Sequence, residues 1–115
     1  MKKFEFKYQF EFFCSPIWIE ENVKNPTPRN VEIADLDINP YLKEELEELN
    51  HLYQEIFNDN YPPESDFKDP ISEYIFVNRV LVSAELLAKE VGEQCTFVFD
   101  YPKWRERKEQ LTNLL

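Results

Sequence analysis

Five aromatic side chains alternate with polar or charged ones near the start of the chain, and they belong to Phe4, Phe6, Tyr8, Phe10 and Phe12. A period of two places all five rings on one side of an extended strand. The pattern therefore predicts a long N-terminal strand over residues 4–12, with one aromatic face and one wet face. Aromatic residues make up 16% of the chain. That is too much ring surface for a disordered tail, so we expect a packed globule.

The next segment is predicted to form a bend, a short strand and a loop. Phe13 interrupts the alternation, and the Cys-Ser-Pro sequence at 14–16 is expected to bend or bulge the chain. The Ile-Trp-Ile sequence at 17–19 resumes as a short strand. Residues 22–30 contain two prolines and read as an exposed loop.

Two helix starts are marked by a capping residue followed by proline. Asn39 precedes Pro40, and Asp69 precedes Pro70. Asparagine and aspartate accept hydrogen bonds from the first free amides of a helix, and proline suits the first helical position. The apolar residues Leu42, Leu46, Leu49, Tyr53 and Ile56 fall on one helical face after the first start, which predicts a helix over 40–58. The second helix should span 70–91 and close at Gly92.

The helix predicted at 70–91 is apolar on two sides. One arc holds Phe76, Val80, Ala84, Leu87 and Val91, and another holds Ile71, Ile75, Val82 and Leu86. A helix of this kind is usually central, packed between a sheet and other helices. A homodimer contact through one of the two faces is the alternative.

A short, ring-rich strand is expected at 95–99, and the turn at 100–102 leads into a last helix at 103–114. The order is strand, strand, helix, helix, strand, helix. We therefore predict an α+β fold, in which a small antiparallel sheet packs against three helices. A chain of 115 residues is expected to form a single domain.

The charge is concentrated in the middle of the chain. Residues 20–73 hold fifteen acidic groups against Lys24, Arg29, Lys43 and Lys68, whereas the whole chain has a formal net charge of −10. Negative potential attracts basic partners and speeds their encounter. Direct binding to nucleic acid is disfavoured because it needs a basic surface.

One helical face carries much of this charge. Four glutamates and a histidine oppose the apolar stripe of the helix predicted at 40–58, and only Lys43 is spaced to help neutralise Glu47. Acidic residues and a tyrosine in the flanking loops extend the surface. Acidic groups mixed with rings provide electrostatic steering and anchor surface for a protein partner. The predicted partner-binding residues are Asp35, Asp37, Glu44, Glu47, Glu48, His51, Glu55, Asp59, Tyr61, Glu64 and Asp66.

The sequence offers little for catalysis. The single glycine, Gly92, excludes a P-loop and a dinucleotide-binding fingerprint, which need several glycines for close approach of the backbone to phosphates. His51 has four glutamates at helical spacing that could join it at a metal ion, but a solvated outer face is expected instead. Cys14 and Cys95 are expected to be reduced. We expect no cofactor, and no segment has the ~20 apolar residues of a membrane span.

Five short segments resemble small immunity proteins of bacterial contact-dependent growth inhibition and related polymorphic toxin systems. They are Phe-Glu-Phe-Lys-Tyr-Gln-Phe at 4–10, Cys-Ser-Pro-Ile-Trp at 14–18, Leu-Glu-Glu-Leu-Asn-His-Leu-Tyr at 46–53, Tyr-Pro-Pro-Glu-Ser at 61–65 and Leu-Leu-Ala-Lys-Glu-Val-Gly at 86–92. The resemblance implies a cytoplasmic protein that neutralises the C-terminal toxin domain of a large secreted effector. Such toxins are often nucleases, whose substrate-binding surfaces are basic, and an acidic inhibitor suits them.

The leading hypothesis is thus an immunity protein that binds a basic protein partner, a nuclease toxin domain, and acts as a monomer rather than a homodimer. One alternative is a nucleic-acid mimic that inhibits another DNA or RNA enzyme. A second is a small enzyme that uses His51 with neighbouring carboxylates. A third is a homodimeric structural protein with no partner for the acidic residues.

Overall fold

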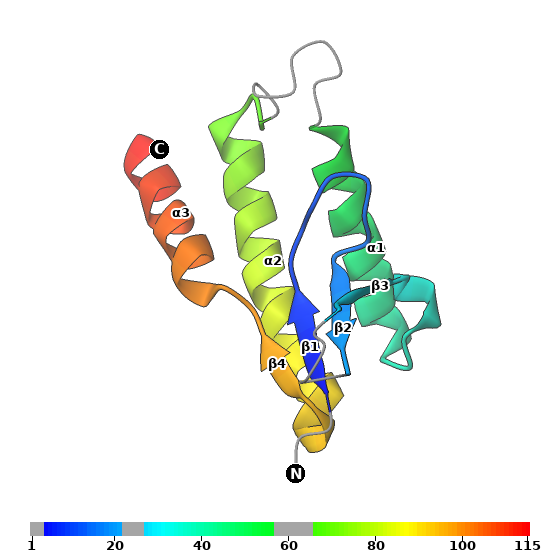
Figure 1. Ribbon diagram of the computed structural model, residues 1–115. Helices are drawn as coiled ribbons and strands as arrows, with labels where there is room; N and C mark the ends of the chain where they lie inside the picture. The colour runs from blue at the N-terminus through cyan, green and yellow to red at the C-terminus, as the bar shows by residue number, and fades with distance from the viewer. Residues whose placement is uncertain (1–3, 22–26, 57–65) are drawn as a thin grey trace.

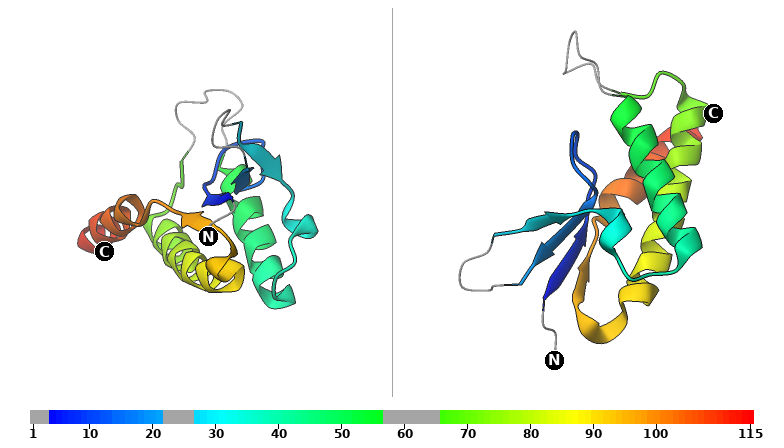
Figure 2. Two further views of the ribbon diagram at one scale, coloured as in Figure 1. Left: turned by 60° about the horizontal axis from the view of Figure 1, so that its bottom comes forward. Right: turned by 90° about the vertical axis from the view of Figure 1, so that its right-hand side faces the viewer.

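The computed structural model describes residues 4–21, 27–56 and 66–115 (Figure 1). The elements are β1 (Glu5–Tyr8), β2 (Ile17–Glu20), β3 (Arg29–Val31), the 3-10 turn η1 (Ile33–Asp35), α1 (Pro40–Glu55), α2 (Pro70–Val91), the 3-10 turn η3 (Gly92–Gln94), β4 (Thr96–Val98) and α3 (Tyr101–Leu114). The strands form one sheet in the order β3-β2-β1-β4. The three helices lie in a layer on one face of this sheet (Figure 2). The predicted α+β fold is confirmed.

The sheet is mixed, so the prediction of an antiparallel sheet is wrong in one pairing. β1 pairs with β2 and β2 with β3 in antiparallel fashion, but β1 pairs with β4 in parallel. A parallel pair needs a long crossover connection. The helices α1 and α2, which lie between β3 and β4 in the chain, provide that crossover. The strand β3 also occupies residues 29–30, which the sequence assigned to a loop.

The first strand is shorter than the alternation predicted. β1 ends at Tyr8, and the amide of Gln9 makes one more hairpin bond, to the carbonyl of Pro16 at 2.8 Å. The chain then turns, and Phe13 takes a left-handed conformation with φ of 65°. The alternation of aromatic and polar residues continues beyond the strand because Phe10 is also buried. Its ring packs on Tyr53 of α1, with the ring centroids 5.2 Å apart. The alternation therefore records burial, not strand pairing.

The predicted caps position the helices. The Asn39 side chain accepts from the amides of Tyr41 and Leu42, and Asp69 accepts from the amide of Ile71. α2 spans the predicted residues 70–91 and ends at Gly92, whose φ of 59° favours glycine. α1 ends at Glu55, and residues 57–58 of the prediction lie outside the described residues. α3 begins two residues earlier than predicted, at Tyr101.

α2 is the middle helix of the layer, between α1 and α3 (Figure 2). Its buried arc, which includes Phe76, Val80, Ala84 and Leu87, packs with β1 and α1 in the core. The Tyr8 hydroxyl reaches Ser83 Oγ at 2.8 Å, and Ser83 in turn donates to the carbonyl of Val80 at 2.7 Å. The second apolar arc is not covered as predicted. Ile71, Ile75, Val82 and Leu86 are 57%, 53%, 54% and 46% exposed, because α1 and α3 pack against the flanks of α2 only.

Candidate partner-binding surface

The acidic face of α1, defined as Glu44, Glu47, Glu48, His51 and Glu55, is exposed in all five of its residues. Leu42, Leu46 and Leu49 are at most 5% exposed. Because these leucines turn one side of α1 into the core, the opposite side faces solvent. The periodicity thus predicted the direction of these side chains. Their role in binding stays a prediction.

Two of the four carboxylates of the acidic face have partners that the sequence did not reveal. Arg79 of α2 donates from Nε to Glu45 Oε2 at 3.0 Å and from Nη2 to Glu45 Oε1 at 2.6 Å. The same Nη2 lies 3.1 Å from Glu48 Oε1. His51 Nε2 lies 2.9 Å from Glu55 Oε1. The prediction that four carboxylates lack local partners is therefore wrong for Glu48 and Glu55.

Glu44 and Glu47 remain the uncompensated carboxylates of the acidic face among the described residues. Lys43 does not neutralise Glu47 as predicted, because its Nζ donates to the carbonyl of Ala34 at 3.0 Å. The carboxylate bonds to Arg79, those from Glu45 first, raise the pKa of that guanidinium above its usual value. Arg79 therefore stays charged and holds α1 against α2, while Glu44 and Glu47 face solvent.

The flanking residues fall at opposite ends of α1. Asp35 and Asp37 are exposed just before the helix begins, one at the end of η1 and one in the link to Asn39. Asp66 lies after the helix and lines a groove to which Tyr53 and Ile56, at the C-terminal end of α1, also contribute. The structure thus unites Asp35 and Asp37 with the N-terminal end of α1 but separates Asp66 from it. Asp59, Tyr61 and Glu64 lie outside the described residues.

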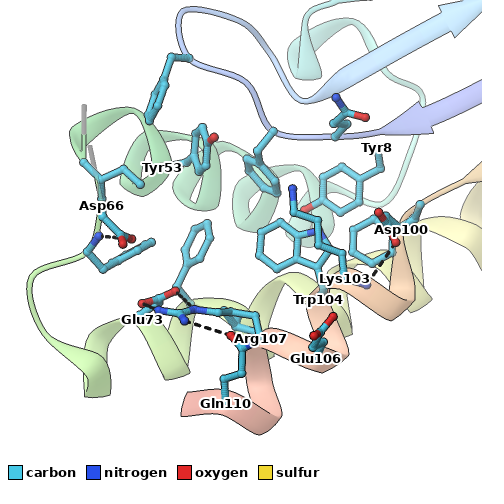
Figure 3. A pocket seen from close by; sticks show the side chains of 18 of the residues that line it. Tyr8, Tyr53, Asp66, Glu73, Asp100, Lys103, Trp104, Glu106, Arg107 and Gln110 are labelled. Atoms are coloured by element: carbon cyan, nitrogen blue, oxygen red, sulfur yellow. Dashed lines mark hydrogen bonds and ion pairs between the residues drawn. The ribbon is translucent and has the colours of Figure 1, made fainter. Parts of the chain in front are cut away.

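A groove of about 870 Å³ lies between the turn after β1, the start of α2 and α3 (Figure 3). Its floor is aromatic: Phe10 lies 5.8 Å from Phe76 and 5.9 Å from Trp104, measured between ring centroids. Its rim holds the ion pair between Glu73 and Arg107, in which Nε donates to Oε2 at 2.6 Å. The sequence missed this groove because its rings read as core. The basic residues Lys103 and Arg107, on either side of Trp104, were the available signal.

A family model for Serratia CdiI immunity protein-like proteins matches residues 5–102. The chain belongs to this family. The match runs from β1 through β4 to the start of α3, so it covers the sheet and both long helices. A comparison with curated proteins found no match. The resemblance to immunity proteins seen in five short segments is therefore confirmed, and membership of this family implies neutralisation of a toxin.

In this member of the immunity protein family, His51 is exposed to solvent. Its side chain is 70% exposed, and it is not among the residues that line the groove. Among the described residues, no group of three or more His, Cys, Asp or Glu side chains could hold a metal ion. Cys14 and Cys95, both in the described part of the chain, are not joined by a disulfide. None of the described helices has the length and apolar character needed to cross a bilayer.

Proposed function

We propose that this chain is an immunity protein that inhibits a cationic nuclease toxin by stoichiometric binding. It acts in the bacterial cytoplasm as one domain and as a monomer, and it catalyses no reaction. It binds neither nucleic acid nor membrane directly. Family membership supports the general role, and the acidic face of α1 supports the class of partner.

The observation that carries this proposal is the exposure of Glu44 and Glu47, neither of which forms an ion pair with another described residue. Carboxylates that repel their neighbours contribute nothing to the stability of an isolated fold. A partner rich in lysine and arginine turns the same repulsion into attraction. It also speeds encounter, because the unscreened potential steers the partner toward the face. A nuclease has such a surface because it must bind the phosphate backbone.

The test uses the purified cognate toxin domain. In the double variant Glu44→Lys/Glu47→Lys, the association rate at low salt should fall by about 10–100-fold. Glu48 is left unchanged because a lysine there would repel Arg79 and disturb the fold. Measurement by biolayer interferometry at two salt concentrations should show that the loss shrinks as salt screens the charges.

The matched control is Glu5→Lys/Glu20→Lys, which changes the net charge by the same amount. These residues face each other across β1 and β2. Side chains alternate between the two faces of a strand, and Phe6 and Ile17 are buried on the face toward the helices. Glu5 and Glu20 therefore lie on the opposite face, which no described helix covers. The association rate of the control should change only a few-fold. Equal losses in both variants would mean that overall charge, and not the acidic face, attracts the toxin.

The nuclease assignment has its own readout. The toxin domain should degrade DNA or RNA in a purified reaction, and one equivalent of this chain should stop it. A toxin that leaves both nucleic acids intact while it still kills cells would overturn the nuclease assignment and leave the immunity role standing.

A further inference from the structure

Four aliphatic side chains of α2 form an outer stripe on the helix layer, on the side away from the sheet. They are Ile71, Ile75, Val82 and Leu86, and each is about half exposed, between 46% and 57%. Spacings of four, seven and four residues keep them on one side of the helix. Figure 2 shows α2 between α1 and α3, so this stripe runs down the middle of the layer. Solvent-facing helix positions have no structural need for so much aliphatic surface.

The outer stripe borders the acidic face of α1 at one residue. Arg79 lies four residues after Ile75 and three before Val82, so it is their neighbour on the helix surface. Its guanidinium bonds to Glu45 and lies 3.1 Å from Glu48. The apolar strip and the acidic residues are therefore parts of one continuous surface, with Arg79 and its carboxylates as the boundary.

This arrangement matches the anatomy of a protein interface. The centre of an interface is apolar and fully desolvated, whereas its rim is polar or charged and sets the rate of encounter. Soluble monomers seldom expose a contiguous apolar strip unless something binds it. The charge of the rim indicates the class of partner. Because the acidic residues lie along one side of the stripe, they favour a partner that has lysines and arginines beside its own apolar patch.

We infer that the outer stripe of α2 is the buried centre of the toxin interface and that the acidic face of α1 is its rim. This inference rests on the proposed function and adds the site and chemistry of docking. The toxin contributes an apolar patch that covers Ile75 and Val82, and basic side chains next to it that meet Glu44 and Glu47. A second copy of this chain is the poorer occupant, because two molecules of net charge −10 repel each other.

The experiment compares two pairs of neutral substitutions. Ile75→Gln/Val82→Gln removes the centre of the stripe without altering charge, and glutamine keeps the helix. Leu114→Gln/Leu115→Gln is the control, since those residues are 67% and 61% exposed at the end of the chain. The probe is the purified cognate toxin domain. Affinity should fall by at least about 30-fold for the first pair and less than about threefold for the control.

Kinetics separate the centre of the interface from its rim. Loss of the apolar centre should raise the dissociation rate and should be the same at about 0.15 M and about 1 M salt, whereas Glu44→Lys/Glu47→Lys should lower the association rate at low salt only. Circular dichroism should show equal folding of all variants. If Ile75→Gln/Val82→Gln binds the toxin as well as the wild type does, the stripe is not the interface, although the proposed function stands.

Two further outcomes would also overturn the inference. If the wild-type chain fails to bind and fails to neutralise the toxin, the proposed function falls and the inference falls with it. If sedimentation shows a dimer of the free chain that Ile75→Gln/Val82→Gln dissociates, the stripe is a contact between two copies. A monomer at all concentrations, together with the 30-fold loss, supports docking of the toxin.

Discussion

Replacing Arg107 of α3 by methionine removes both hydrogen bonds to the Glu73 carboxylate of α2. In the wild type, Nε donates to Oε2 at 2.6 Å and Nη2 donates to Oε1 at 2.7 Å. The Glu73 side chain is only 11% exposed, and no other described group bonds its carboxylate. Breaking a buried ion pair costs about 3–5 kcal/mol. Because the Arg107 side chain is 39% exposed, we expect a loss of about 2–3 kcal/mol in the free energy of unfolding.

The two partners should not contribute equally. Glu73→Met leaves a guanidinium that can turn to water and still donates to Gln110 Oε1 at 3.2 Å, so its cost should be about 1 kcal/mol. The double variant Glu73→Met/Arg107→Met leaves no buried charge and should lie within about 1 kcal/mol of the wild type. The two substitutions should therefore be strongly non-additive.

Urea denaturation followed by circular dichroism measures these differences, with an unchanged m-value as the check on two-state unfolding. In thermal unfolding, Arg107→Met should lower the Tm by roughly 10 °C. Arg29→Met is the control, since Arg29 and Glu21 form a pair 62% and 65% exposed and should contribute at most about 0.5 kcal/mol. If Arg107→Met costs no more than Arg29→Met, or if the double variant is as unstable as Arg107→Met, then an unpaired Glu73 carboxylate is not what destabilises the fold.

Three other predictions follow from the contacts of Tyr8, Gln54 and Arg79. Burial raises the pKa of Tyr8 above its ordinary value near 10.0, so the folded state keeps a proton that the unfolded state releases. Unfolding free energy should thus fall by up to about 1.4 kcal/mol per pH unit above pH ~10 in urea titrations, and Tyr8→Phe should make that fall shallower. Gln54→Ala removes bonds to the amide of Phe13 and the carbonyls of Glu11 and Cys14, which should cost about 1–2 kcal/mol and speed hydrogen exchange at Phe13. Arg79→Gln should cost about 1–2 kcal/mol in urea denaturation, and about 1 M salt should reduce that difference by screening Glu45 from Glu48.

Helix positions were predictable because the signals that set them are local. Asn39 and Asp69 cap their helices through side-chain bonds to amides two or three residues later, and Gly92 ends α2 with a positive φ. Each signal needs only a few neighbouring residues. The start of α3 was missed because Asp100 was taken for a turn residue, whereas its side chain accepts from the amide of Lys103.

Strand pairing was not predictable because it depends on residues far apart in the chain. The parallel pairing of β1 with β4 joins Phe6 to Phe97, and it follows from the path of α1 and α2 between them. Nothing in the local pattern at 95–99 distinguishes a parallel from an antiparallel partner. The strand at Arg29–Val31 likewise has almost no apolar alternation and exists because β2 offers it a free edge.

In the candidate site, too, local features were predictable and contacts between distant residues were not. Periodicity placed Glu44, Glu47 and Glu48 on one exposed face, but it could not show that Arg79, from another helix, would reach Glu48. Periodicity also found both apolar arcs of α2. Which arc the sheet covers depends on the packing of α1 and α3, and the sequence of α2 alone does not reveal that packing.

Pairing with arginine separates five glutamates of α1 and α2 into two sets. Glu45, Glu48 and Glu73 each meet an arginine from α2 or α3, so they stabilise the contacts between helices and are explained by folding. Glu44 and Glu47 are exposed without such a partner among the described residues, and their repulsion opposes folding. Only this second set calls for an external cation. An external basic partner is therefore indicated by Glu44 and Glu47 on the acidic face of α1 together with the outer stripe of α2, and a net charge of −10 without these two features would not indicate one.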